Sequence, residues 1–393
     1  MRRFIALMTF VIPFIVDAQL KVWVSYNDEE FAVFKQLVTA FEESTSIEVN
    51  VQRIPFEGQE QKILTACATR TAPDLARVDC AFLGKLAHRR ALLDIDIGEL
   101  TDKIVPVALQ SCILNGKLYG VPDQLTCVCL FYNKKLFREA GLDPNKPPAT
   151  WDEFLKYAQK LTDHSKGIYG FAMRNTLWWT LPFFYSFGAN FIEDNTCVLN
   201  SPEAVAALQF KVDLYRKYKV EPGAWKSGAI DPDMGFQNEK YAMVLNGPWK
   251  IKLLKTIGID FGVAPIPAGK KGGYTTIGGT NFVIFRGTKH KHEAVEFIKF
   301  IVSKESQIKW ANELGQIPVN IEAFPYVDTT RHPYLKVFLY QLQYAIARPV
   351  LADYPAIENV ANPIMEAALM GEKPVKEALA LIVDKINAIL QEE

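Results

Sequence analysis

The sequence predicts an α/β protein built around two sheets, and three observations support this. At 393 residues the chain exceeds the about 250–300 residues at which single hydrophobic cores stop growing. Residues 20–54 read as strand, helix and strand, which is typical of a βαβ unit. Well-marked helix starts then recur as far as the C-terminus. Because no clean linker interrupts these segments, we expect two α/β lobes between which the chain crosses more than once.

The first unit is the clearest. Residues 21–26 form a short apolar strand, and Ile47, Val49 and Val51 alternate as a second strand. Between them lies an apolar stripe at helical spacing, made of Phe31, Phe34, Val38 and Phe41. A strand, a helix and a strand in this order predict a right-handed crossover and a parallel sheet. The same reasoning predicts helices over 60–69 and 82–92 and strands over 74–78 and 127–132.

Later helices are marked by their first residues. Thr150 and Glu153 have the spacing of a capping box, and Ser201 before Pro202 places an N-cap ahead of a proline at the first helical position. Two apolar stripes then define long helices, namely Val205, Leu208, Val212 and Tyr215 and, at the C-terminus, Val375, Leu379, Ile382, Ile386 and Ile389.

The N-terminus reads as an export signal. Arg2 and Arg3 precede an uncharged run over residues 4–16, and small residues end at Ala18. The run is shorter than the about 20 residues that a membrane-spanning helix needs. We therefore predict a signal peptide over residues 1–18, cleaved after Ala18. The first cysteine is Cys67, so the cleavage site offers no lipoprotein cysteine, and the mature chain should be free in the periplasm.

Composition excludes several classes of function. Lys and Arg together number 44, as do Asp and Glu, so the chain has no net charge with which to bind nucleic acid. Six cysteines could pair in 15 ways, but they are too sparse for a disulfide scaffold and form no zinc motif. Cys127 and Cys129 alternate on one strand face near the distance limit for a bridge. We expect mostly buried thiols and no metal or other cofactor.

A tryptophan placed directly after a strand is the first candidate binding residue. Strand-like residues 241–246 end in Asn-Gly-Pro, and Trp249 follows at the start of helical sequence. Gly247 is expected to allow a tight turn, and Pro248 suits the first helical position. Ligand crevices of open α/β sheets lie beside such helix starts. Trp249 is therefore predicted to face a crevice; alternatively, it covers the end of the sheet.

A second aromatic cluster, "NTLWWTLPFFYSFGANF", contains adjacent Trp178 and Trp179. Two adjacent residues of a helix cannot face the same way, so one ring is expected to be displayed. Aromatic faces with polar groups nearby suit sugars, whose C–H faces pack on the rings. An aromatic-rich core helix is the alternative.

Polar candidates follow predicted strands. Asp79 follows one strand, Asp123 and Gln124 precede another, and Asn281 follows a Gly278-Gly279 pair that would let backbone approach a ligand. Each could instead be an ordinary turn or cap residue. Catalytic motifs such as GxSxG, HExxH, the P-loop and GxGxxG after a strand do not occur. With 44 carboxylates, a glycosidase pair stays open, although no pair is marked by its setting.

Several segments occur in an order that resembles a known family. They include "PDLARVD", "NGKLYGVP", "LFYNKKLFREAGL", "TWDEFLKYAQKLT", "YAMVLNGPW" and "HEAVEFIKFIVSKESQ". Together they resemble the extracellular solute-binding protein family 1 of bacterial ABC importers, especially its maltose, maltodextrin and trehalose binders. The resemblance spans residues 19–390.

This resemblance implies a type II periplasmic-binding-protein fold with a ligand cleft between two lobes. The first lobe would contain residues 19–125 and 280–325, and the second residues 126–279 and 326–393. A monomer would close on a sugar by hinge motion and dock on the importer's permease subunits. The implied ligand is an α-gluco-oligosaccharide such as maltose, maltotriose or trehalose.

The resemblance also carries over site residues. Trp249 and Trp178 match sugar-stacking positions, and Asp79 falls in a loop that bonds sugar hydroxyls. Relatives often have a carboxylate near Thr126 and an aromatic residue at Thr280, so their absence here implies one fewer stacking face and a smaller ligand or altered specificity. The predicted ligand-binding residues are Tyr26, Asp79, Gln124, Trp178, Trp179, Trp249, Gly279 and Asn281.

Two other functions stay open at this point. A binding protein for another solute, such as a different oligosaccharide or a polyol phosphate, would share the fold. A secreted glycoside hydrolase would need two carboxyl groups about 5–9.5 Å apart in the cleft.

Overall fold

The computed structural model describes residues 19–391, so the predicted signal peptide and its cleavage site lie outside the described residues. The N-terminal strand, helix and strand are present as predicted: β1 (Leu20–Val24), α1 (Asp28–Thr45) and β2 (Val49–Arg53). The two strands pair in parallel. Asn27 and Glu30 form a capping box at the start of α1. The hydrophobic spacing therefore correctly predicted a βαβ unit.

The larger sheet has the strand order β13-β12-β3-β1-β2, and β6 also pairs with β12. The strands added to the first unit are β3 (Leu75–Asp79), β6 (Val121–Cys127), β12 (Thr275–Ile284) and β13 (Ala345–Ile346). β3 runs parallel to β1, whereas β12 is antiparallel to both β3 and β6. The parallel strands β1, β2 and β3 thus end at the same edge of this sheet. Thr280, in the middle of β12, pairs with Asp79 at the end of β3 and so lies at the same edge.

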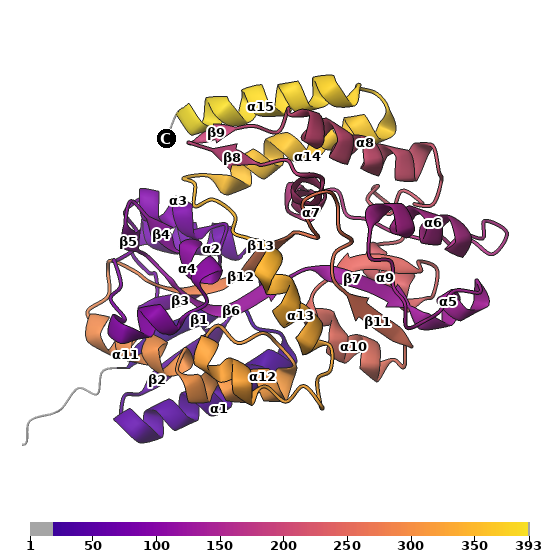
Figure 1. The fold of residues 1–393 in the computed structure, drawn as a ribbon. Helices are drawn as coiled ribbons and strands as arrows, with labels where there is room; N and C mark the ends of the chain where they lie inside the picture. Colours follow the sequence, from indigo (N-terminus) through magenta and orange to yellow (C-terminus); the bar gives the residue numbers. More distant parts are fainter. Residues whose placement is uncertain (1–18, 392–393) are drawn as a thin grey trace, which may run out of the picture.

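A second, three-stranded antiparallel sheet has the order β10-β7-β11. Its strands are β7 (Cys129–Asn133), β10 (Met243–Asn246) and β11 (Phe261–Ala264). Only Val128 separates β7 from β6, so the chain passes from one sheet to the other almost without a break (Figure 1). The strand predicted over 127–132 is therefore in fact the junction of two strands.

The chain passes between the two sheets from β6 to β7 and again from β11 to β12, and β13 pairs with the start of β12. The Thr275 hydroxyl, at the start of β12, donates to the Val128 carbonyl at 2.9 Å. Thr275 and Thr276 also pair with Ala345 and Ile346 of β13. Residues from three distant parts of the sequence thus meet at one level.

Helices surround both sheets. Near the larger sheet are η1 (Gly98–Lys103), η3 (Ile321–Tyr326), α2 (Gln59–Thr69), α3 (Leu83–His88), α4 (Pro106–Gln110), α11 (Lys291–Ile301) and α12 (Lys304–Leu314). The others are α5 (Lys134–Glu139), α6 (Trp151–Leu161), α7 (Leu177–Phe187), α8 (Pro202–Arg216), α9 (Pro232–Gln237), η2 (Pro248–Lys250), α10 (Ile251–Thr256), α13 (Leu335–Gln341), η4 (Leu342–Tyr344), α14 (Tyr354–Met370) and α15 (Val375–Gln391). Two short hairpins complete the fold: β4 (Ile113–Leu114) with β5 (Lys117–Leu118), and β8 (Ile192–Glu193) with β9 (Thr196–Cys197).

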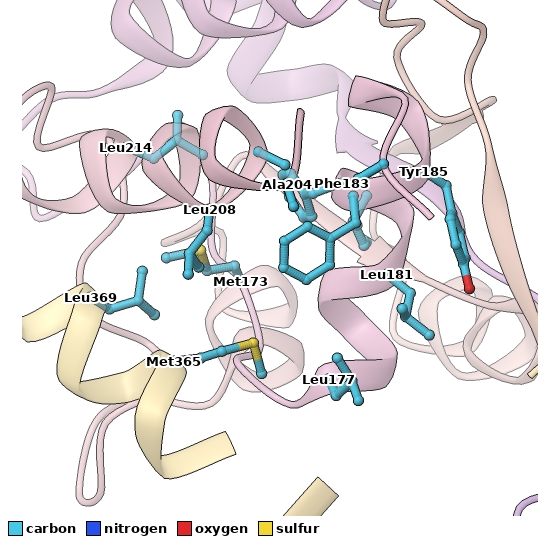
Figure 2. Close-up of a cluster of buried hydrophobic side chains, with 14 of the residues drawn as sticks. Met173, Leu177, Leu181, Phe183, Tyr185, Ala204, Leu208, Leu214, Met365 and Leu369 are labelled. Carbon is cyan, nitrogen blue, oxygen red and sulfur yellow. The ribbon is translucent and has the colours of Figure 1, made fainter. Parts of the chain in front are cut away.

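The aromatic cluster of the sequence is largely core. In Figure 1, α14 and α15 lie beside α8, and Figure 2 shows buried side chains of α7, α8 and α14 pointing toward one another. Phe183 and Leu181 of α7 are buried there, together with Leu208 of α8 and Met365 of α14. This packing fixes the helix that carries Trp178 and Trp179.

Some local predictions need correction. The helix predicted over 82–92 ends at His88. Thr150 caps α6 as predicted, but Glu153 accepts a hydrogen bond from the Ala149 amide instead of the Thr150 amide, so the capping box is incomplete. Ser201 caps α8 as predicted. Within residues 19–391, no helix has the length and apolar character that crossing a membrane requires.

Candidate functional site

A cavity of about 540 Å³ lies at the carboxyl ends of β1 and β3, between the larger sheet and the starts of α7 and η2. Residues from most of the chain line it: Ser25, Asn27, Glu30, Phe56, Arg77, Asp79, Gln124, Thr126, Thr176, Trp178, Trp249, Gly278, Gly279, Thr280, Arg348 and Glu358. A larger cavity, of about 670 Å³, lies near the ends of α2 and α3, but none of the predicted site residues lines it. The 540 Å³ cavity is therefore the candidate site.

Five of the eight predicted residues line this cavity, namely Asp79, Gln124, Trp178, Trp249 and Gly279. The other three do not line it. Tyr26 is 3% exposed, and its hydroxyl donates to Asp123 at 2.7 Å. Asn281 is 1% exposed, and its side-chain nitrogen has no hydrogen-bond partner within the described chain. Trp179 is half-buried and contacts both lining tryptophans edge-on.

Three indole rings form one side of the site. The centroids of Trp178 and Trp249 are 6.4 Å apart with the rings tilted by 38°, and Trp179 contacts Trp178 edge-on at 4.6 Å. The Trp178 Nε1 donates to the Ile277 carbonyl of β12 at 3.1 Å, so this ring is tied to a strand of the other sheet. The aromatic surface is therefore fixed before any ligand binds.

The turn before Trp249 explains why a glycine stands at 247. Gly247 has φ −122°, a conformation open to any residue, so the tight turn expected from the sequence is not the reason. Instead, a Cβ at this position would lie 1.9 Å from Cζ3 of Trp249. Pro248 occupies the first position of η2, as predicted, and Trp249 the second. Glycine is needed because the indole ring folds back over it.

Asp233 of α9 holds the same turn from behind. It accepts from the Asn246 amide at 2.7 Å and pairs with Lys250 at 2.8 Å and with Arg174. Burial alone would raise the pKa of Asp233, but the two cations outweigh it and lower the pKa below the ordinary value. The Arg174 guanidinium also lies 4.4 Å from the Trp179 ring centroid. Asp233 thus supports the turn that carries Trp249 and, through Arg174, the ring of Trp179.

Asp123 organises the polar floor of the cavity. It accepts hydrogen bonds from the Tyr26 hydroxyl at 2.7 Å, the Arg77 Nε at 2.9 Å and the Thr280 hydroxyl at 2.9 Å. Burial, together with the Asp123 charge, raises the pKa of Tyr26 well above its ordinary value. These contacts join β3, β6, β12 and the segment that follows β1. Thr280 also lines the cavity, where its side chain offers a hydroxyl held by Asp123 and no aromatic face.

Gln124 belongs to a second buried network. Its amide donates to Glu30 at 2.8 Å and its carbonyl accepts from Arg77. Glu30 also accepts from the Gln316 amide at 2.7 Å, and Gln316 accepts from the Trp310 indole at 3.1 Å. Each amide has defined partners, so the orientation of Gln124 is set before ligand binding.

Arg348 and Glu358 are site residues that the sequence did not indicate. The Arg348 guanidinium donates to Asp79 at 3.1 Å and to the Cys80 sulfur at 2.8 Å, and it lies 5.9 Å from the Trp178 ring centroid. Glu358 accepts from the Trp178 backbone amide at 3.2 Å, and burial raises its pKa. Neither residue stands in a local motif, and their partners lie about 180–270 residues earlier.

The cysteines take no part in cross-linking. All six lie within residues 19–391 and are free thiols, five of them buried, as expected from their number and spacing. Burial raises the pKa of Cys80 to about 11, although Arg348 beside it acts in the opposite direction.

The sequence is similar to those of bacterial solute-binding proteins. A family model described as bacterial extracellular solute-binding protein matches residues 36–337. A binding protein of Brucella abortus is 27% identical over 379 residues, covering 93% of this chain and 92% of that protein. The maltotriose-binding protein of Pyrococcus abyssi is 28% identical over 347 residues, covering 85% and 73%.

Two solved structures share the fold over nearly their whole length. The solute-binding protein of Thermotoga lettingae bound with α-D-tagatose has a TM-score of 0.84 at 27% identity, covering 95% of this chain and 100% of that one. The GacH receptor of Streptomyces glaucescens, solved without ligand and with acarbose, has a TM-score of 0.85 at 26% identity, covering 96% and 99%.

Proposed function

This chain belongs to the bacterial extracellular solute-binding protein family, and from that premise we propose that it is the substrate-binding protein of an ABC sugar importer. It takes an α-gluco-oligosaccharide, such as maltose, maltotriose or trehalose, into the 540 Å³ cavity and delivers it to the membrane permease. The ligands named for relatives, maltotriose and acarbose among them, support a sugar of this class.

One observation carries the proposal: two fixed indole faces and a set of charged hydrogen-bonding groups line the same cavity. A pyranose ring has an apolar C–H face and an edge of hydroxyls. The first packs on Trp178 and Trp249, and the second bonds Asp79, Gln124 and Arg348. Because these groups are already held by the protein, binding costs little side-chain entropy.

The charge of the lining argues against an anionic ligand such as a polyol phosphate. The cavity presents three carboxylates, Glu30, Asp79 and Glu358, but only two guanidinium groups. Arg77 is already paired with Asp123 at 2.9 Å, and Arg348 with Asp79 at 3.1 Å. A phosphate would meet no uncompensated cation, whereas neutral hydroxyls can donate to the carboxylates.

The carboxylates serve to position groups, so we propose that no bond is made or broken. Asp79 accepts from Arg348 and from the Ala81 amide at 2.7 Å. Glu358 holds the Trp178 amide at the start of α7. Incubation with maltodextrin should therefore return the sugar intact, and released glucose would instead establish a glycoside hydrolase.

We also propose that ligand capture closes two lobes. The first consists of residues 19–125 and 280–325, and the second of residues 126–279 and 326–393. β6 and β12 run across the boundaries at 125 and 279, so bending would occur where these strands leave the larger sheet. The closed monomer then docks on the permease.

Calorimetric titration tests the proposal. The purified chain lacking residues 1–18 is titrated with maltose, maltotriose, trehalose, a non-glucose disaccharide and glycerol phosphate. We expect saturable binding of at least one α-glucoside, weakened by about 10-fold or more in Trp249→Ala. Trp23→Phe, which alters an indole outside the cavity, is the matched control. If the protein binds only glycerol phosphate, its ligand is an anion and the proposal of a sugar ligand is wrong.

A further inference from the structure

One aromatic ring at the cavity is about half exposed to solvent. Phe56 lies in the loop between β2 and α2 and lines the cavity, yet its side chain is 52% exposed. Every other phenylalanine of residues 19–391 is buried or half-buried, and Phe56 has no ring contact with another aromatic residue in that range. A core function therefore does not account for it.

The backbone around Phe56 is nevertheless fixed. The Ile54 amide donates to the Val24 carbonyl at 2.8 Å, and Ile54 itself is buried. The Gln59 amide donates to the Phe56 carbonyl at 3.3 Å, and Gly58, with φ +76°, provides the left-handed turn into α2. The ring is thus displayed from a rigid turn. An exposed aromatic on a rigid support is the usual form of a ligand platform.

Phe56 and the two tryptophans reach the cavity from different parts of the fold. It follows β2, whose carboxyl end lies at the same edge as the ends of β1 and β3. Trp178 and Trp249 come from α7 and η2, which pack with the smaller sheet. The cavity therefore has aromatic faces from both parts of the fold, although Thr280 offers none.

We propose that Phe56 is a third stacking face, which makes the site selective for oligosaccharides of at least three units. This inference rests on the proposed function. One sugar unit packs on Trp178 and Trp249, and Phe56 covers a further unit near the cavity mouth. This proposal differs from the smaller ligand that the missing aromatic at position 280 implied, and the experiment below distinguishes the two.

The test compares ligand lengths in calorimetry. Maltose, maltotriose and maltotetraose are titrated into the wild type, Phe56→Ala, Phe56→Tyr and Tyr326→Ala. Tyr326 is a matched control because it is 54% exposed but does not line the cavity. We expect Phe56→Ala to weaken maltotriose and maltotetraose by about 3- to 10-fold and maltose by less than 2-fold. Phe56→Tyr should restore the wild-type order, and Tyr326→Ala should change nothing.

The outcomes separate this inference from the proposed function. If Phe56→Ala weakens the affinity for all three sugars equally, or for none of them, Phe56 does not select ligands by length. The proposed sugar-binding function would be unaffected by that result. If Phe56→Ala binds every sugar normally but supports less uptake in cells, Phe56 contacts the permease and the inference fails. If the wild type binds no member of the series, the proposed function itself fails and the inference with it.

Discussion

The indole ring of Trp249 lies directly over the α-carbon of Gly247, so closely that a methyl group there would come within 1.9 Å of Cζ3 and 2.2 Å of Cη2. Atoms joined to different residues do not approach so closely. The Trp249 ring can therefore occupy this position only because residue 247 is a glycine.

Gly247→Ala should displace the Trp249 ring from the cavity wall. We expect the free energy of unfolding to fall by about 1–3 kcal/mol, the usual cost of overpacking, and sugar affinity to fall with it. Urea denaturation and calorimetric titration measure the two effects. Gly287→Ala is the control, because a Cβ there meets nothing within 4 Å. A Gly247→Ala protein with wild-type stability and affinity would show that the ring does not occupy this position.

Asp123→Asn should be strongly destabilising. Arg77 is buried, and the substitution would leave its charge uncompensated while weakening the bonds from Tyr26 and Thr280. Breaking a buried pair in this way costs about 3–5 kcal/mol. Urea denaturation gives the loss. Asp260→Asn, which breaks an exposed pair with Arg138, should cost no more than about 1 kcal/mol. Equal losses in the two variants would contradict a special role for Asp123.

Lys211 of α8 should make stability depend on pH. Its ammonium nitrogen is buried, donates to the Thr180 hydroxyl at 2.6 Å and lies 5.4 Å from the Phe183 ring centroid. Burial lowers the pKa of Lys211 to about 7 from an ordinary 10.5, although the charge of Glu221 acts in the opposite direction. Between these values the unfolded chain holds a proton that the folded chain has lost. Stability from this residue therefore rises as the pH increases from 7 toward 10.

Lys211→Met removes this dependence. Over pH 7–10 the wild type should gain about 3 kcal/mol of unfolding free energy relative to Lys211→Met, as measured by urea denaturation at several pH values. Lys217→Met, at an exposed lysine just beyond the same helix, should give a curve parallel to the wild type. Parallel curves for Lys211→Met as well would mean that Lys211 keeps its proton in the folded state.

Local features of the fold were predictable from the sequence because they depend on neighbours in the chain. The alternation of Val49 and Val51 and the stripe of Phe34, Val38 and Phe41 led to the parallel β1–α1–β2 unit. Ser201 before Pro202 correctly marked the start of α8. In each case the spacing of apolar residues, or one capping side chain, is enough to predict the helix or strand.

Features that depend on distant partners could not be predicted. Arg348 meets Asp79, 269 positions earlier, and nothing in the surrounding sequence distinguishes it from a surface arginine. The glycine of "NGPW" was assigned to a turn, whereas the structure shows that it makes room for a ring. Trp178 and Trp179 could not be told apart by sequence, because the Ile277 carbonyl and Arg174 that hold them lie in other elements.

The buried thiols have a consequence for how the protein is made. The chain belongs to an extracellular family, and disulfides form in oxidising compartments, yet all six cysteines are unpaired and only Cys67 is partly exposed. While the chain is unfolded, every thiol can be trapped in a non-native disulfide. Once the chain has folded, burial raises the pKa of Cys80, Cys112, Cys129 and Cys197 and so suppresses the reactive thiolate. Burial in the folded chain therefore protects these thiols from oxidation. Folding that is fast relative to thiol oxidation should keep non-native disulfides from forming.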